Sequence, residues 1–319
     1  MASDKRARDL EAAPARGAPD AWARPSLMDW ARALRLHQWV KNSLIFVPAV
    51  LGGASHSPSA WIHGLLGFFG LGLVASATYV INDLCDLADD RAHWAKRHRP
   101  FASGRIPIAA GVAVSGVGLV LGLGLAWMAQ GLAALGVVGA YLGLTLSYSL
   151  AMKRTPILDV AILATLFTLR LALGVVCAQV VWSAWLLVFS MFLFSSLSFA
   201  KRLTEILRLK AQGGDRLPGR GYEAADAPFV QAMGVSLSAA AVLVMVMYLI
   251  EEAFGTGLYR TPQLLWTLPL LLALWLGRIW LLCGRGVLDD DPVIFALRDR
   301  ASLALGGLVA LSVLAAALL

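Results

Sequence analysis

Long apolar runs, repeated along almost the whole chain, constrain the fold more than any other feature of this sequence. A run of this length crosses the hydrocarbon core of a bilayer as a helix. The residues are 59% hydrophobic and only 15% charged, which is unlike an ordinary soluble domain. The sequence therefore predicts an all-α, polytopic membrane protein.

Nine of these runs are candidate transmembrane helices. Their approximate limits are 40–53, 60–81, 108–128, 132–151, 156–178, 182–200, 229–250, 263–283 and 301–319. The connection between the third and fourth runs is short, and a long polar connection separates the sixth from the seventh. We expect a nine-helix bundle around a cavity that opens to the cytosol.

The distribution of basic residues predicts how the bundle is oriented. Lys and Arg are abundant in the N-terminal segment and in the connections after the second, fourth, sixth and eighth runs. The other connections together contain one such residue, Arg260. Under the positive-inside rule, the N-terminus lies in the cytosol and the C-terminus outside, in the cell (inner) membrane. The net charge of +7 is explained by these connections and by anionic substrates, so nucleic-acid binding is not expected.

The N-terminal segment is predicted to be a mobile cytosolic tail over residues 1–28, followed by one transmembrane domain over 29–319. Residues 1–25 contain no apolar stretch of the kind found in signal peptides. An interfacial amphipathic helix is also possible here, formed by Trp22, Leu27, Trp30 and Leu34 with Arg24, Arg32 and Arg35. Three cysteines, Cys85, Cys177 and Cys283, fit neither a disulfide framework nor a zinc site.

An acidic motif, Asn82 to Asp90, follows the second run. If the motif is helical, Asp83, Asp86 and Asp90 lie on one face, with Asn82 one turn from Asp86. Carboxylates so close together repel one another unless a cation lies between them. Mg²⁺ takes such oxygen ligands, usually together with substrate phosphates. The alternative is a solvated acidic loop at the membrane surface.

Arg170 is the unusual residue inside the fifth run. It lies three helical turns beyond Asp159, so both side chains project from nearly the same face. An ionisable group at this depth almost always faces the bundle interior or a wet cavity. Two interpretations stay open, namely the cationic wall of a cavity and an Arg that braces neighbouring helices through their carbonyl groups.

Further polar clusters occur at the cytosolic ends of the runs. Together they would form a ring of Lys, Arg and Asp suited to a polyanionic headgroup and its metal ion. The members are His37–Asn42, Tyr148, Lys153, Arg154 and Asp159, then Lys201, Arg202 and Glu205, and finally Asp289–Pro292 and Arg298–Arg300.

The pattern Asn82-Asp83-x-x-Asp86-x-x-x-Asp90 resembles the first aspartate-rich motif of the UbiA superfamily of intramembrane prenyltransferases. The resemblance extends from about residue 30 to the C-terminus. It implies nine transmembrane helices around a cavity open to the membrane, and a first motif that binds Mg²⁺ and a phosphorylated substrate.

A narrower resemblance is to the decaprenyl-phosphate phosphoribosyltransferase branch of that superfamily. It is carried by Arg35–Asn42, by Asn82–Pro100 with Lys96-Arg97-x-Arg99-Pro100, by Tyr148 to Asp159, and by Leu169-Arg170, Lys201-Arg202, Asp291-Pro292 and Arg298–Arg300. One departure is Leu36, where relatives often have Pro, and we expect it to affect only the entry to the first helix.

The connection after the sixth run differs from that of aromatic prenyltransferases. Those enzymes have a second aspartate-rich motif there, whereas this chain has Lys201, Arg202 and Glu205. Two cations favour bare phosphate over a metal ion. This difference suits phosphoribosyl pyrophosphate and polyprenyl phosphate as substrates.

The resemblance therefore implies transfer of a 5-phosphoribosyl group to a polyprenyl phosphate, with release of pyrophosphate, for cell-envelope glycan precursors. Asp83, Asp86 and Asp90 are the implied catalytic residues, and with Asn82 they hold Mg²⁺. The implied substrate-binding residues are Lys41, Asn42, Asn82, Lys96, Arg97, Arg99, Tyr148, Lys153, Asp159, Arg170, Lys201 and Arg202. The alternatives are prenyl transfer to an aromatic acceptor and a transporter or lipid carrier. A homo-oligomer is possible.

Overall fold

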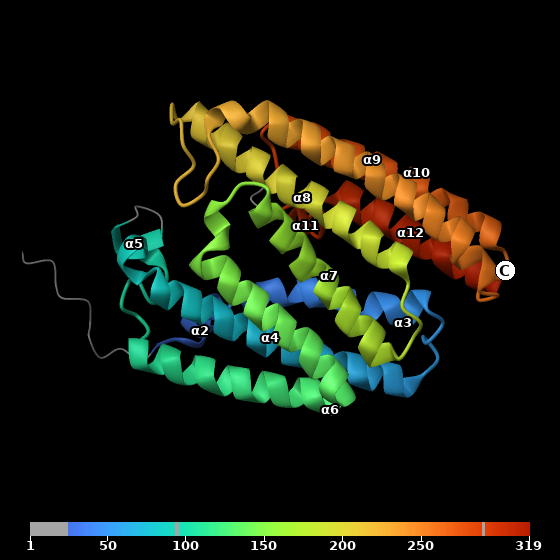
Figure 1. Cartoon of the computed structure of the whole chain (residues 1–319), viewed down its shortest axis with the longest axis horizontal. Coiled ribbons are helices and arrows are strands. Elements are labelled where there is room, and N and C mark those ends of the chain that lie inside the picture. The colour runs from blue at the N-terminus through green and yellow to red at the C-terminus, as the bar shows by residue number, and fades with distance from the viewer. Residues whose placement is uncertain (1–24, 93–95, 289–290) are drawn as a thin grey trace, which may run out of the picture.

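The computed structural model describes residues 25–92, 96–288 and 291–319, and this part of the chain is helical (Figure 1). Two sequence predictions lie outside the described residues: the tail over residues 1–24, with Trp22 and Arg24, and the acidic residues Asp289 and Asp290. Within the described ranges, the β-structure is a single isolated bridge between Arg216 and Glu223.

The elements follow one another in this order: α2 (Leu27–Ala33), η1 (Leu36–Phe46), α3 (Val47–Leu51), α4 (Pro58–Cys85), α5 (Leu87–Ala92), η2 (Lys96–His98), α6 (Ile108–Leu150), η3 (Met152–Arg154), α7 (Leu158–Ala178), α8 (Ala184–Ala211), η4 (Ala224–Asp226), α9 (Ala227–Glu251), η5 (Ala253–Gly255), η6 (Pro262–Trp266), α10 (Thr267–Gly284), α11 (Pro292–Ala296) and α12 (Arg300–Leu318). The α labels denote α-helices and the η labels denote 3-10 helices.

Seven helices in the described part of the chain are long and apolar enough to cross a membrane. The polytopic helical class is therefore confirmed, whereas the count of nine spans stays a prediction. Two features account for the difference. Helix α6 covers two predicted spans and breaks at Gln130 and Gly131, where the chain reverses direction (Figure 1). The first predicted span is built from η1 and the short α3, so it is not one regular α-helix.

The helices pack closely where glycines remove side chains from the interface. A Cβ on Gly70 of α4 would lie 2.9 Å from the carbonyl oxygen of Gly122 in α6, and a Cβ on Gly174 of α7 would lie 2.2 Å from that of Ile45 in η1. Such small residues let helices approach in a membrane, where van der Waals packing and not hydrophobic burial drives association. These contacts hold η1, α4, α6 and α7 together.

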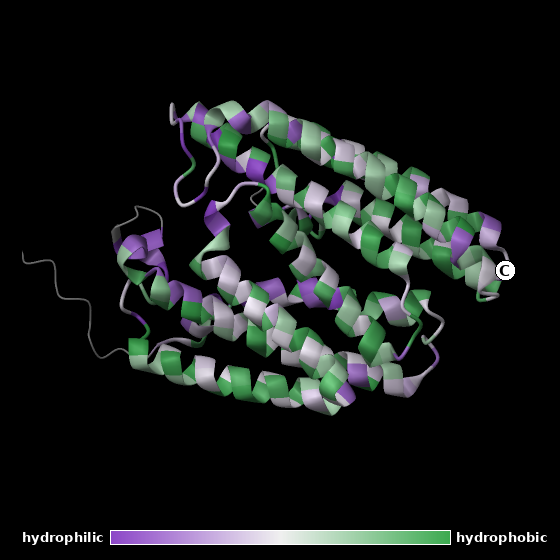
Figure 2. Ribbon diagram, in the orientation of Figure 1, coloured by the Kyte–Doolittle hydropathy of each residue, from purple (hydrophilic) through white to green (hydrophobic). Residues whose placement is uncertain are grey.

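Polar residues gather at one end of the bundle, around α5, η3 and the connection from α8 to α9 (Figure 2). Short helix α2 lies near this end and begins after Ser26, whose hydroxyl accepts a hydrogen bond from the backbone N–H of Asp29 at 3.1 Å. The predicted boundary between tail and domain at residue 28 therefore falls inside a capped helix. This polar end contains the candidate site.

Candidate functional site

The acidic motif spans the end of α4 and the start of α5. Asp83 is buried in the last turn of α4, and its Oδ1 accepts hydrogen bonds from Arg35 at 2.7 Å and Arg99 at 3.1 Å. The same Arg99 guanidinium donates to Oδ2 of Asp90 at 2.7 Å. Two carboxylates from different helices are thus joined through one cationic group.

Asp86 is the C-terminal cap of α4, and helical backbone hydrogen bonds from Asp86 to Asn82 and from Asp90 to Asp86 continue across this position. The three aspartates differ in their side-chain partners. The Asp86 carboxylate instead accepts hydrogen bonds from Lys153 at 3.0 and 3.2 Å and from Asn82 at 3.2 Å. These contacts divide the motif into a pair joined by Arg99, Asp83 and Asp90, and a separate carboxylate, Asp86.

The donor set of this motif fits a hard divalent cation. Within residues 25–92, 96–288 and 291–319, no three His, Cys, Asp or Glu side chains are grouped closely enough to hold a metal ion by themselves. Mg²⁺ does not require such a group, since it is commonly held by one or two carboxylates together with substrate phosphates. Asp83 and Asp90 already converge on one cation, Arg99, so the pair is placed to do this.

Lys41 and Asp291 form a second ion pair, between η1 and the start of α11. Asp291 also caps α11 through hydrogen bonds from the N–H groups of Val293 and Ile294. Burial acts to raise the pKa of Asp291, but the charge and hydrogen bond of Lys41 outweigh this effect and leave the pKa below its ordinary value. Asp291 therefore stays ionised and positions Lys41.

Arg170 lies inside the bundle, as its depth in the sequence indicates. Its guanidinium donates to Asn42 Oδ1 at 3.1 Å, to the Leu166 carbonyl oxygen at 2.6 Å and to the Tyr141 hydroxyl at 3.1 Å. It also lies 5.1 Å from the ring centroid of Phe167. These partners are all neutral, and Arg170 forms no direct ion pair with any of the residues that the structure describes. Contact with substrate stays a prediction.

A third cluster surrounds Arg202, which is fully buried. Its guanidinium donates to Asp159 Oδ2 at 2.7 Å, to Glu205 and to the Tyr148 hydroxyl at 3.3 Å. Two carboxylates neutralise this cation, which leaves it little capacity to bind a substrate phosphate. The adjacent Lys201 is only partly buried and, among the described residues, forms no ion pair.

The basic segment after the acidic motif is brought to the site only in part. Arg99 reaches the motif, whereas Lys96 and Arg97 lie in the exposed turn η2. Sequence reasoning omitted Arg35 and Arg220 from the candidate residues. Arg35 is the first residue of the segment Arg35–Asn42, which carries the narrower family resemblance, and it could have been included on that ground. Nothing in the pattern around Arg220 marks it.

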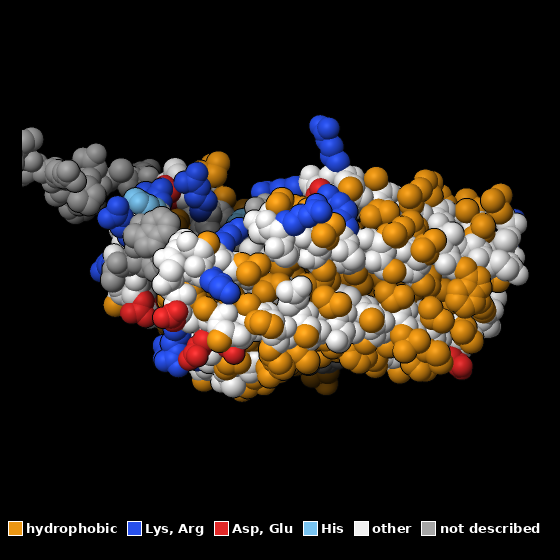
Figure 3. Space-filling view, turned by 90° about the horizontal axis from the view of Figure 1, so that it is seen from above, with side chains coloured by type: hydrophobic (Ala, Val, Ile, Leu, Met, Phe, Trp, Pro, Cys, Tyr) orange, Lys and Arg blue, Asp and Glu red, His pale blue; other side chains and the backbone are white. Residues whose placement is uncertain are grey.

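Basic side chains dominate this end of the molecular surface. Figure 3 shows Lys and Arg gathered toward the polar end of one face, with hydrophobic side chains covering much of the remainder. This separation is typical of a protein whose apolar belt lies in lipid and whose charged end lies at the headgroups.

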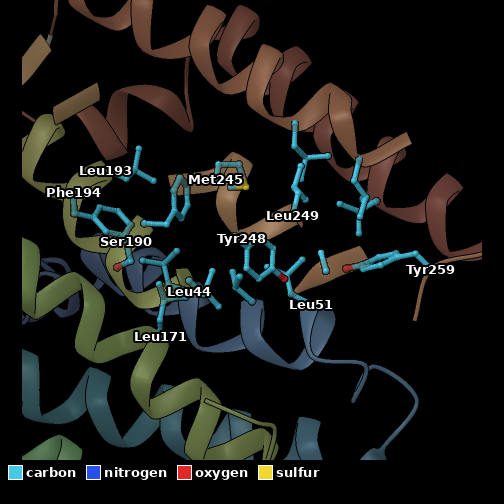
Figure 4. A pocket seen from close by; sticks show the side chains of 17 residues that line it. Leu44, Leu51, Leu171, Ser190, Leu193, Phe194, Met245, Tyr248, Leu249 and Tyr259 are labelled. Atoms are coloured by element: carbon cyan, nitrogen blue, oxygen red, sulfur yellow. The ribbon is translucent and has the colours of Figure 1, made fainter. Parts of the chain in front are cut away.

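An apolar cavity of about 210 Å³ lies within the bundle (Figure 4). Its lining includes Leu44, Leu171 and Phe194 toward one side and Tyr259 toward the other. The ring of Phe194 stacks on that of Phe167 with centroids 4.3 Å apart, and the Lys41 ammonium lies 5.5 Å from the Phe167 centroid. The Phe167–Phe194 pair therefore separates charged groups from an apolar chamber.

Comparison with known proteins gives a consistent family assignment. Residues 43–298 match the UbiA prenyltransferase family. Protein y4nM of Sinorhizobium fredii is 43% identical over 88% of this chain, and nodulation protein NoeC of Azorhizobium caulinodans is 32% identical over 88% of this chain and 91% of its own length. The chain spans about half (54%) of the length of the Sinorhizobium protein.

A third relative and a solved structure extend the comparison. The decaprenyl-phosphate phosphoribosyltransferase of Corynebacterium glutamicum is 34% identical over 55% of this chain and 54% of that protein. The structure of an Archaeoglobus fulgidus UbiA homologue bound to DMAPP and Mg²⁺ superposes with a TM-score of 0.67 at 17% identity, covering 90% of this chain and 97% of that one. The latter likeness concerns the fold.

Proposed function

Since this chain belongs to the UbiA prenyltransferase family, we propose that it is a Mg²⁺-dependent transferase that moves a 5-phosphoribosyl group from phosphoribosyl pyrophosphate to a polyprenyl phosphate. The products would be the phosphoribosylated lipid and pyrophosphate, used for cell-envelope glycans. The corynebacterial relative is named a decaprenyl-phosphate phosphoribosyltransferase. The two relatives with longer matches carry no such reaction in theirs, so the proposal rests mainly on the site.

The observation that carries the proposal is that cations on α7 and α8 lack direct ion-pair partners among the described residues. Where a metal-binding prenyltransferase would place a second acidic pair, this chain has Lys201 without an ion-pair partner among the described residues. The hydrogen-bond partners of Arg170, one helix away, are neutral groups within the described part of the chain. Cations without direct ion pairs favour phosphate groups, which can form such pairs with them.

The acidic motif suits the diphosphate of the donor. Asp83 and Asp90 would hold Mg²⁺, with Asp86 and Asn82 in support. Bound Mg²⁺ would stabilise the charge that develops on the departing pyrophosphate. Arg35 and Arg99 already contact this carboxylate pair and can turn toward phosphate oxygens. The donor is thereby oriented with its ribose toward the centre of the bundle.

The second group of cations suits the lipid phosphate. Lys41 lies 5.5 Å from the ring centroid of Phe167, which stacks on Phe194 in the cavity wall, and Lys201 is close enough to interact electrostatically with Lys41. A phosphate held by these two cations would have its tail beside an apolar wall. The cavity is smaller than the roughly 300–1,000 Å³ typical of drug-sized ligand pockets. A long polyprenyl tail would therefore extend beyond it into the bilayer.

The reaction itself needs little from the protein beyond orientation and charge. A phosphate oxygen of the lipid attacks C1 of the ribose, the bond from C1 to the pyrophosphate oxygen breaks, and its electron pair leaves with pyrophosphate. The attacking phosphate is already ionised near neutral pH, so no side chain has to remove a proton. Positioned cations stabilise charge on both phosphate groups throughout.

The test compares two substrate pairs with the same purified protein and Mg²⁺. One pair is phosphoribosyl pyrophosphate with a polyprenyl phosphate, and the other is a polyprenyl diphosphate with 4-hydroxybenzoate. We expect a phosphoribosylated lipid from the first pair only. A prenylated aromatic from the second pair would instead place this chain among the aromatic prenyltransferases, and product from neither would favour a binding or transport role. The proposed orientation puts the site on the cytosolic side of the inner membrane.

A further inference from the structure

The connection between α8 and α9 folds back onto the turn between α6 and α7. Backbone hydrogen bonds from Leu217 to Tyr222 at 2.9 Å and from Ala224 to Asp215 at 2.8 Å close residues 215–224 into a compact loop. Figure 1 shows this loop extending from the ends of α8 and α9 toward the connection that enters α7. The loop belongs to the polar end of the bundle.

Two contacts fix the loop in this position. The Tyr222 hydroxyl donates to Asp159 Oδ1 at 2.9 Å and accepts from the backbone N–H of Ile157 at 2.8 Å. Gly221 lies directly against the turn, since a Cβ at this position would be 2.4 Å from the carbonyl oxygen of Arg154. Ile157 has a φ of 68°, which is strained for a β-branched residue and is held by this docking. The loop is therefore packed in a defined position against the turn between α6 and α7.

Docking of the loop brings Arg220 onto Tyr148. Its guanidinium lies 5.6 Å from the centroid of the Tyr148 ring, and Nη1 donates to the Tyr148 hydroxyl at 2.5 Å. The same nitrogen lies 3.5 Å from the carbonyl oxygen of Lys153, whose ammonium group contacts Asp86. Lys153 therefore links Arg220 to Asp86 of the acidic motif, although Arg220 lies far from this motif in the sequence.

The charge around Arg220 is not balanced by its own contacts. The Tyr148 hydroxyl accepts hydrogen bonds from both Arg220 and Arg202, so two guanidinium groups converge on one neutral oxygen. Asp159 and Glu205 neutralise Arg202. Arg220 is half-buried and forms no ion pair with any carboxylate in the described part of the chain. An anion that reaches Arg220 can therefore form the ion pair that its present contacts do not provide.

We propose that Arg220 is a diphosphate-binding residue, contributed to the site by the α8–α9 loop. It contacts the diphosphate of the donor and then the released pyrophosphate, on the side of Lys153 and Asp86. It does not bind the lipid phosphate, which is assigned to Lys41 and Lys201 beside the apolar cavity. This inference rests on the proposed function for the identity of the donor, but its ligand chemistry is that of pyrophosphate alone.

Binding of inorganic pyrophosphate to the full-length purified protein, with Mg²⁺ present, tests this assignment. We expect Arg220→Gln to weaken binding by about ten- to a hundredfold, the loss of one charge-assisted hydrogen bond to phosphate. Gln can still donate to the Tyr148 hydroxyl, so the loop keeps an anchor. Arg220→Lys, which restores the charge, should recover much of the lost affinity, whereas a purely structural Arg would not be rescued in this way.

The matched control lies in the same loop. Arg216 is 75% exposed and pairs with Glu223 at 3.0 Å, so Arg216→Gln should leave pyrophosphate binding unchanged. Wild-type affinity in Arg220→Gln, or equal losses in the Arg216 and Arg220 variants, would overturn the assignment. If wild-type protein binds pyrophosphate but forms no phosphoribosylated lipid, the proposed function fails while this inference survives.

Discussion

Two carboxylate clusters at the polar end of the bundle contain similar residues but have different surroundings. The first cluster, Asp83 and Asp90 with Arg35 and Arg99, has cations that are about 30% exposed (27% and 32%). In the second, Arg202 and Asp159 have side chains that are 0% exposed. Under the proposed function, the open cluster would exchange its cations for a metal ion and phosphate, whereas the closed cluster has its charges paired within the protein. The two clusters contain similar residue types, and they differ in how far their arginine side chains are exposed to solvent.

The largest effect is expected at the edge of the open cluster. Asp86→Asn replaces a carboxylate by a neutral amide, which holds a metal ion more weakly, and should reduce turnover by about a thousandfold or more, because bound metal contributes several kcal/mol to such reactions. Phosphoribosyl transfer at saturating substrate is the measurement. Asp89→Asn is the control, since Asp89 is exposed on α5, and it should retain activity. Full activity of Asp86→Asn at ordinary Mg²⁺ would remove Asp86 from the proposed metal-binding residues.

Substitutions in the closed cluster should lower the stability of the fold. Arg202→Ala leaves the buried carboxylate of Asp159 without its partner, and removing one member of a buried ion pair costs about 3–5 kcal/mol. We expect a large decrease in the temperature at which the protein unfolds in detergent. The double variant Arg202→Ala/Asp159→Asn should recover part of this loss. If Arg202→Ala is stable but cannot bind substrate, the two clusters do not divide their roles as described.

An intermediate effect is expected at Lys201, which lies next to the closed cluster but forms no ion pair among the described residues. Lys201→Ala should weaken the apparent affinity for the lipid phosphate by about ten- to a hundredfold. The dependence of the rate on Mg²⁺ should stay the same. Titrations of each substrate for both proteins measure this. An unchanged affinity for both substrates would mean that Lys201 only anchors α8 at the interface.

The smallest effect is expected at Asp299, which forms an ion pair with Arg278 outside both clusters. The Arg278 hydrogen bonds lower the pKa of Asp299, which also caps α12 through Ser302. A lowered pKa stabilises the fold above the ordinary value of 3.8, and this contribution is lost as the pH falls through the lowered pKa. Asp299→Ala should cost about 1 kcal/mol at pH 7 and less in strong acid. Thermal unfolding at both pH values measures the difference, and a pH-independent cost would contradict the account.

Much of this architecture is predictable from sequence, because membrane spans are specified locally. The predicted span 156–178 and helix α7 (Leu158–Ala178) nearly coincide, and the depth of Arg170 correctly indicated an interior position. The acidic motif is recognisable from its spacing alone. The break after Cys85 is not, since Asn82 to Asp90 has no Pro or Gly that would end a helix.

The contacts that divide the clusters depend on distant parts of the chain. Arg202 is neutralised by Asp159, 43 residues earlier, and Arg220 reaches Tyr148, 72 residues earlier. The sequence predicts both Arg202 and Lys201 as phosphate ligands, because the sequence of two adjacent cations does not show that they have different partners. Their side chains leave the helix in different directions, so one is enclosed by carboxylates and the other is not.

The most direct test of the account follows the two ends of the donor separately. Phosphoribosyl pyrophosphate is labelled with ³²P either on the 5-phosphate or on the terminal phosphate of the diphosphate, and each form is incubated with the purified protein, Mg²⁺ and a polyprenyl phosphate. We predict that the 5-phosphate label enters the lipid fraction and that the terminal label is recovered as aqueous pyrophosphate. Terminal label in the lipid, or no label in the lipid from either form, would contradict phosphoribosyl transfer.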